Sequence, residues 1–115
     1  MRRHVPIALA MLLAAAPLLA HHGWSSYDAE QTMTLTVELE QVRYRNPHAE
    51  VEITHDGEPW VVVLAPTSRM SARGLPKGAL VAGKTITIVG YPRKDGTPEL
   101  RAERIVVDGK TIELR

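Results

Sequence analysis

A strict alternation of apolar and polar residues over positions 33–39 is the feature that most limits how this chain can fold. Met33 and every second residue up to Leu39 are apolar, and the residues between them are polar. This period of two is that of a half-buried β-strand and does not fit a helix. The apolar row then moves to even positions at Val42 and Tyr44, a one-residue shift that is typical of a β-bulge. We therefore predict one long strand that bends at a bulge near residues 40–41.

Turn signals divide the rest of the chain into further strands. Asn46-Pro47 ends the first strand, because the residue before a proline is restricted and proline cannot donate to a ladder. Asp56-Gly57 and Asp108-Gly109 are strong signals for tight turns, and another turn is expected over 94–97. The strands predicted between these turns cover residues 49–55, 60–64, 84–91, 100–107 and 110–114. The strand over 100–107 has a second shift of its apolar row, between Ala102 and Ile105.

One helical segment interrupts the strands. Ser68 is expected to cap a short helix over residues 68–73, with Gly74 just past its end and Pro76 beyond. Three strands, a helical piece, two strands and a tail is the element order of the OB-fold, a five-stranded, partly open Greek-key barrel. The expected fold is therefore all-β, a small OB-like barrel of five to six strands with one short helix. A plain β-sandwich is the competing arrangement.

The first twenty residues have the pattern of a signal peptide. Arg2 and Arg3 are followed by an uncharged stretch over 5–20, which is too short for a comfortable membrane span. Cleavage after Ala20 would give a signal peptide over 1–20 and a single domain over 21–115. The expected location is then periplasmic or secreted, with no stable membrane anchor after cleavage. An uncleaved N-terminal anchor helix is the alternative.

Composition excludes several classes of function. The 115-residue chain has no cysteine, which removes disulfide frameworks, thiolate metal sites and cysteine nucleophiles. With 14 Lys+Arg against 13 Asp+Glu, it has no basic field of the kind that holds nucleic acid. It also has neither a nucleophile-elbow serine nor a glycine-rich phosphate loop. We therefore expect no enzyme activity, no catalytic residues and no nucleic-acid partner.

The strongest candidate for chemistry is a metal site at the expected mature N-terminus. Cleavage after Ala20 would place a free amine and an imidazole together on His21, and His22 adds a second ring. Such nitrogen donors suit Cu(II), Ni(II) and Zn(II). His48 follows the stiff Pro47 and completes the predicted set, with Asp28 as a weaker oxygen ligand. The competing interpretation is a solvated tail with two histidines and a surface histidine in a turn.

Two functions therefore stand side by side. The first is an exported, non-enzymatic protein that binds a divalent transition metal such as copper. The second is a periplasmic module that binds a protein, a peptide or an envelope glycan without a metal, and it requires an exposed apolar or aromatic patch. Because the chain has no phenylalanine, most of its aromatic residues are expected to supply core volume: Trp24, Tyr27, Tyr44, Trp60 and Tyr91. Trp24, if it enters the barrel, would hold the chain close to the expected amine.

The order and spacing of several short motifs resemble a family of small exported bacterial proteins of unknown function. These motifs are the His21-His22-Gly23-Trp24 stretch, Tyr27-Asp28, Asn46-Pro47-His48, Trp60, Gly90-Tyr91, Asp95-Gly96 and Leu100-Arg101-Ala102. Members of that family typically have a His-His pair after the signal peptide and an Asn-Pro-His turn. The resemblance implies no established activity. Members often carry an acidic residue near the end of the Trp strand, where this chain has Val63.

Overall fold

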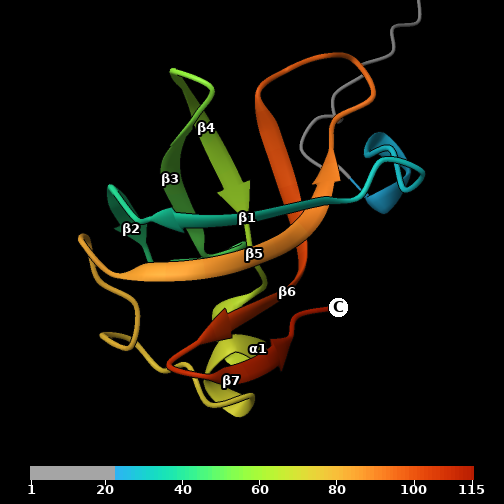
Figure 1. The fold of residues 1–115 in the computed structure, drawn as a ribbon. Coiled ribbons are helices and arrows are strands. Elements are labelled where there is room, and N and C mark those ends of the chain that lie inside the picture. Colours follow the sequence, from blue (N-terminus) through green and yellow to red (C-terminus); the bar gives the residue numbers. More distant parts are fainter. Residues whose placement is uncertain (1–22) are drawn as a thin grey trace, which may run out of the picture.

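A computed structural model describes residues 23–115 of the chain. Seven strands, a short α-helix and one turn of 3-10 helix make up this part (Figure 1). In chain order they are η2 (Trp24–Ser26), β1 (Met33–Glu38), β2 (Gln41–Arg43), β3 (Glu50–His55), β4 (Glu58–Val63), α1 (Thr67–Ala72), β5 (Thr85–Pro92), β6 (Glu99–Val107) and β7 (Lys110–Glu113).

The strands form one curled sheet with the order β1-β5-β6-β4-β3-β2, and β7 pairs with β6. All neighbours are antiparallel except β4 and β6, which run parallel. β1 and β2 lie at opposite ends of this order although only two residues separate them. The chain therefore joins the two ends of the sheet and curls it into the expected small, OB-like barrel. A β-sandwich, the competing arrangement, is wrong.

The predicted long first strand is present as β1 and β2, interrupted at Leu39 and Glu40. The Leu39 N–H donates to the carbonyl of Lys84 beside β5, whereas the Glu40 N–H donates to the carbonyl of Glu52 on β3, both at 2.8 Å. The chain thus changes its partner strand at this step. The shift of the apolar row near residues 40–41 is confirmed as the place where the strand bends, and the division raises the strand count to seven.

The second predicted shift of the apolar row is a bulge between β5 and β6. Val89 pairs with Arg104 and Gly90 pairs with Ala102, so Glu103 is an extra residue on β6. Gly90 is required at this point, because a Cβ atom there would lie 2.3 Å from the carbonyl oxygen of Arg101. The bulge turns Leu100, Ala102 and Ile105 all toward the core, where each is fully buried.

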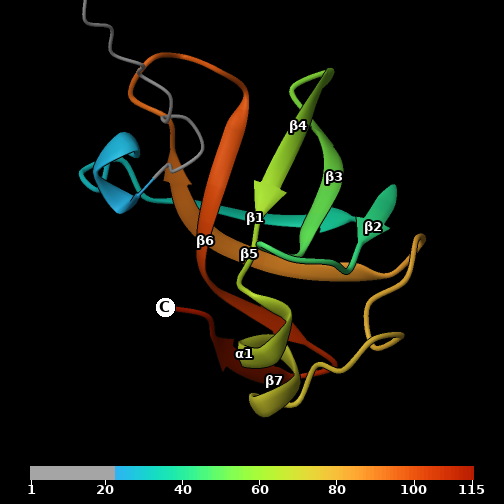
Figure 2. The same ribbon diagram turned by 180° about the vertical axis from the view of Figure 1, so that it is seen from behind.

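α1 packs against one end of the barrel, next to β7 (Figures 1 and 2). It contributes Met70 to the core, which also contains Leu39, Ile53, Ile88 and Leu114. The predicted helix over 68–73 is one residue too late: α1 begins at Thr67, and Pro66, not Ser68, is its N-cap. Pro66 has the extended backbone of an N-cap residue, with a ψ of 146°, and provides no side-chain cap hydrogen bond.

The remaining predicted bounds differ from the observed ones by up to two residues, and both Asp-Gly turns are confirmed. Asp56 and Asp108 have φ angles of 53° and 52°, and the glycines after them have 77° and 79°. Two consecutive residues with positive φ form the type I′ turn that suits a two-residue hairpin. No helix between residues 23 and 115 is long and apolar enough to cross a membrane.

Candidate functional site

His48 lies on the outer face of the barrel, just before β3. Its neighbour Ala49 extends the β3–β4 ladder, since the Ala49 N–H donates to the carbonyl of Ala65 at 2.7 Å. Ala49, Val51 and Ile53 face the core and are buried, so the residues between them face outward. His48 is half-buried on this outer face.

The turn that precedes His48 is fastened to the start of α1. The Asn46 side-chain oxygen accepts hydrogen bonds from the backbone N–H and the hydroxyl of Thr67, at 3.3 and 3.0 Å. The Tyr44 hydroxyl donates to the carbonyl of Leu75, at 2.9 Å. The Asn46–Pro47 peptide bond is cis. The hydrogen bonds of Asn46 and Tyr44 attach the turn before His48 to α1 and to the segment after it.

Trp24 lies on the outside of the barrel and does not enter its interior. The Cζ atoms of Arg101 and Arg115 lie 4.4 and 4.3 Å from the centre of its ring, and the Tyr91 ring meets it edge-on at 6.2 Å. A guanidinium over an indole face is a favourable cation–π contact, most so where water is excluded. The half-buried Trp24 is thus held at a defined place on the sheet by Arg101 of β6, Tyr91 of β5 and Arg115, and we call this place the seat of Trp24.

Arg101 is the buried support of this seat, with 7% of its surface exposed. Its neighbours Leu100 and Ala102 face the core, so Arg101 faces outward, where Trp24 and Tyr27 cover it. Burial lowers the pKa of Arg101 from its ordinary value, and the nearby guanidiniums of Arg69 and Arg115 lower it further. The sequence offered one signal of this residue, a charged side chain between two core residues of a predicted strand.

Tyr27 fastens the chain after Trp24 to the end of β5. Its phenol is buried and donates a short hydrogen bond to the Glu99 carboxylate. Tyr27 forms a β-bridge with Arg93, and the Asp28 N–H donates to the Pro92 carbonyl at 2.8 Å. The segment that leads into β1 is therefore held to the sheet from its first described residues.

The seat of Trp24 and the position of His48 belong to one outer face. Glu50 on β3 pairs with Val63 on β4, and Val63 pairs with Arg101 on β6. Paired residues point to the same side of a sheet, and neighbouring strands lie about 4.8 Å apart. Arg101 is thus about 10 Å from Glu50 across two strands, and His48 is two residues from Glu50 on the same face.

Asp28 has a local role in the turn before β1. One carboxylate oxygen accepts from the Glu30 backbone N–H and the other from the Gln31 side-chain amide, each at 3.0 Å. This is the usual arrangement of an Asp that shapes its own turn. A shallow hollow of about 360 Å³ beside the turn is lined by Trp24, Tyr27, Asp28, Lys94 and Arg115, among others.

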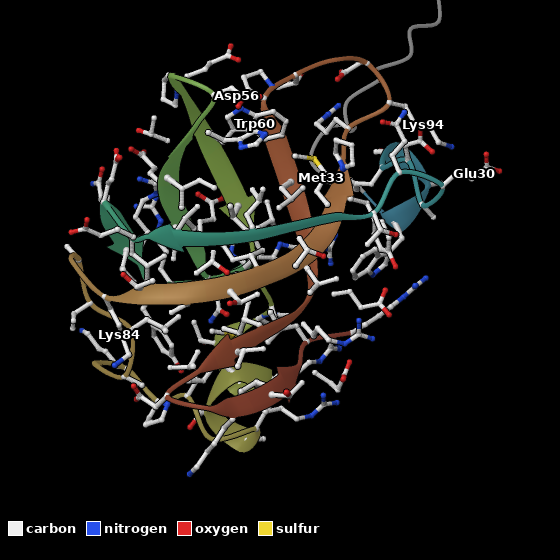
Figure 3. The ribbon with its side chains drawn as sticks, in the orientation of Figure 1. Glu30, Met33, Asp56, Trp60, Lys84 and Lys94 are labelled. Atoms are coloured by element: carbon white, nitrogen blue, oxygen red, sulfur yellow. The ribbon has the colours of Figure 1, made fainter. Side chains whose placement is uncertain are left out.

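The predicted ligands His21 and His22 lie outside the described residues. Within residues 23–115, no three His, Cys, Asp or Glu side chains come together in a group that could hold a metal ion. His55 meets Trp60 edge-on at 5.5 Å, and its Nε2 lies 3.4 Å from an Asp56 carboxylate oxygen. Trp60 lies with Met33 at the end of the barrel opposite α1 (Figure 3).

The aromatic residues divide between the core and the outer face. Tyr44 and Trp60 pack against the core, whereas Tyr27 is buried outside it, against Arg101. The expectation that most of the aromatic residues supply core volume is therefore wrong. Trp24 and Tyr91 instead meet on the outer face. The sequence did not predict that Arg101 and Arg115 contact the Trp24 ring, because both arginines are distant from Trp24 along the chain.

Comparison with known proteins gives a family but no activity. No curated protein matches this chain. One family model covers residues 9–100, which includes η2, the outer-face residues His48 and Val63, and the whole of β5, and it ends at the start of β6. The chain thus belongs to a family of unknown function, DUF6152.

Proposed function

We propose that this chain is an exported, non-enzymatic protein that binds a divalent transition metal such as Cu(II) through His21, His22 and His48. Removal of the signal peptide over 1–20 would give His21 its free amine. The observation that supports the proposal is the seat of Trp24 on Arg101, on the same outer face as His48.

The distances allowed by the chain are compatible with one shared site. His21 precedes Trp24 by three residues, and three extended residues span at most about 10 Å. His48 lies two residues along the strand from Glu50, which places it about 12 Å from the β6 position on which Trp24 rests. An amine and three imidazoles would supply nitrogen donors of the kind that Cu(II) prefers. Asp28, whose carboxylate oxygens each accept one hydrogen bond within its own turn, stays the weaker oxygen ligand of the proposed set.

The proposed site has a characteristic pH dependence. Every ligand must lose a proton before it binds, so protons and metal compete. Metal affinity should begin to weaken below the amine pKa of about 7.7–8.0 and should fall steeply below about 6.5, the ordinary pKa of imidazole.

The deciding experiment compares three forms of the purified protein. Mass spectrometry of the exported protein first establishes whether His21 is its first residue. Cu(II) is then titrated into this protein, into His48→Ala and into a variant with one extra residue before His21. We expect both changes to weaken binding at least about tenfold, as losses around a metal site commonly do. His55→Ala is the matched control and should keep the full affinity; equal affinity for all forms would overturn the shared site.

Arg101 provides a test of the seat of Trp24. Arg101→Ala removes the buried guanidinium under the indole, so the histidines would lose their fixed position and Cu(II) affinity should fall. Arg101→Lys should recover only part of it, because an ammonium lacks the planar guanidinium that stacks on an aromatic face. Unchanged Cu(II) affinity in a folded Arg101→Ala protein would show that the seat of Trp24 does not position the metal ligands.

A second function is supported by a different surface. A groove of about 610 Å³ lies between β2 and the segment before β5, lined by Gln41, Val42, Tyr44, Leu80 and Val81 among others. Val81 is 51% exposed, the one large hydrophobic side chain between residues 23 and 115 with this exposure. A module for a protein, peptide or envelope glycan would use this groove without metal. Binding of peptides or glycans by metal-free protein, abolished in Val81→Glu, would favour it over the metal site.

A further inference from the structure

The end of the molecule formed by α1 and β7 carries a band of cations. α1 contains Arg69 and no acidic residue in its first turn, and Arg73 is its C-cap. Lys110 begins β7, and Arg115 follows shortly after that strand. We call these four residues the cationic band: Arg69, Arg73, Lys110 and Arg115.

Contacts with the backbone of the last residues hold the band together. Arg69 donates to the Leu114 carbonyl at 3.0 Å, and Arg73 donates to the Glu113 carbonyl at 2.5 Å. Both arginines therefore extend from α1 along the end of β7. Lys110 shares a small hollow with Gly74 and Leu75, the residues just after Arg73. Arg69, Arg73 and Lys110 thus follow the seam between the helix and the strand, and Arg115 lies at its end with its guanidinium over Trp24.

The positive charge of the band is largely uncompensated. In the described part of the chain, no carboxylate forms a salt bridge with Arg69, Arg73 or Lys110. Arg115 reaches Glu103 at 3.5 Å, but that carboxylate is also bound by Arg104 at 3.3 Å. A carbonyl oxygen accepts a hydrogen bond without neutralising the charge, and each guanidinium keeps further N–H groups to donate.

The shape of this end favours a broad surface over a pocketed ligand. α1 and β7 project from the barrel in both ribbon views (Figures 1 and 2). The hollow beside Lys110 measures about 120 Å³, below the roughly 300 Å³ at which small-molecule pockets begin. Guanidinium groups bind phosphate with paired N–H groups, and clusters of exposed cations attract anionic lipid surfaces.

From these observations we propose that the cationic band binds the anionic surface of a phospholipid bilayer. The contact is peripheral and electrostatic, with lipid phosphates facing Arg73 and Lys110, which are both exposed. Arg115 also contacts Trp24, so the test uses Arg73 and Lys110, which contact neither Trp24 nor the proposed metal-ligating histidines in any described interaction.

Vesicle binding tests the band directly. Purified protein beginning at His21 is sedimented with phosphatidylcholine vesicles that contain or lack phosphatidylglycerol. We expect binding only to the anionic vesicles and release at high salt, because exposed charges are screened within a few ångströms there. Equal binding to both kinds of vesicle, or no binding to either, would overturn the proposal.

Matched variants identify the residues. The Arg73→Gln, Lys110→Gln double variant should bind anionic vesicles about 30-fold more weakly, from about 1 kcal/mol for each cation. Lys94→Gln removes one exposed cation from the turn between β5 and β6 and should bind as before. If the double variant unfolds, Lys110→Gln alone should still lose about fivefold. Equal loss of vesicle binding in Lys94→Gln would contradict the assignment to the band. Polyglutamate is then added as a competitor. If it displaces the vesicles and itself binds as tightly, the band binds an acidic protein and not a membrane.

Discussion

At the scale of single residues, Arg101 organises the outer face of the barrel. A guanidinium with 7% exposure is costly to bury unless neighbouring groups compensate it, and here the rings of Trp24 and Tyr27 cover it. Its backbone also requires Gly90 opposite, because the Arg101 carbonyl fills the space where a Cβ atom would lie. Arg101 therefore contacts Gly90 at the bulge through its backbone carbonyl and the indole of Trp24 through its guanidinium.

Gly90→Ala tests the close approach at the bulge. The added Cβ would meet the Arg101 carbonyl oxygen at 2.3 Å, and a backbone atom in a paired strand moves only with the sheet. We expect a loss of about 2–3 kcal/mol in the free energy of unfolding, the upper range for overpacked sites. Urea denaturation measures it, with Gly23→Ala as a control, since nothing lies within 4 Å of a Cβ there. A loss under about 0.5 kcal/mol for Gly90→Ala would show that the sheet accommodates the methyl group.

Ionisation of Tyr27 is expected to lower the stability of the folded protein at alkaline pH. Burial, followed by the hydrogen bond to Glu99, raises the pKa of its phenol above the ordinary value of 10.0. In the unfolded chain the phenol loses its proton above about pH 10, while in the folded protein it keeps it. The stabilisation is therefore complete below pH 10 and declines as the pH rises further. Stability measured from pH 9 to 11 should fall less steeply in Tyr27→Phe; parallel curves would contradict this assignment.

At the scale of elements, the first strand shows what could be predicted from sequence. Alternation over 33–39 was readable because β1 is half-buried and one face packs against the core. Local sequence indicates the bend near residues 40–41 but not the change of partner strand there, because the partners of β1 and β2 depend on non-local pairing. The parallel β4–β6 pair could not be predicted for the same reason. The seat of Trp24 could not be predicted either, because Arg101 and Arg115 are distant from Trp24 along the chain. Local sequence likewise does not show that Arg69 of α1 and Arg73 at its C-cap donate to carbonyls at the end of β7.

Those two arginines attach the last strand to the helix. Arg69→Ala should remove the hydrogen bond to the Leu114 carbonyl and lower the free energy of unfolding by about 1.5–3 kcal/mol, as for bonds from charged donors. The effect should concentrate in β7, whose amides should exchange with solvent faster than those of β3. Hydrogen exchange followed by NMR measures both strands. Equal acceleration in β3 and β7 would mean that the arginine supports the whole fold and not this strand.

At the scale of the whole molecule, the proposed metal site would connect the start of the domain with the turn before β3. A ligand that binds only the folded state stabilises it by mass action, by about 2.7 kcal/mol at one hundred times its Kd. Cu(II) at that concentration should therefore raise the melting temperature of the protein that begins at His21. It should leave the melting temperature of His48→Ala much less changed. A similar rise in both proteins would assign the effect to metal bound elsewhere.

The division of the first strand also constrains the order in which the chain can fold. Within residues 23–115, β1 pairs only with β5, whose residues are among the later ones to leave the ribosome. Until Thr85–Pro92 is available, β1 lacks the strand with which it forms its hydrogen-bonded ladder. The β3–β4 hairpin, in contrast, can form on its own short turn. Closure of the barrel therefore waits for contacts that are distant in sequence, and such topologies fold slowly compared with helical bundles of the same size.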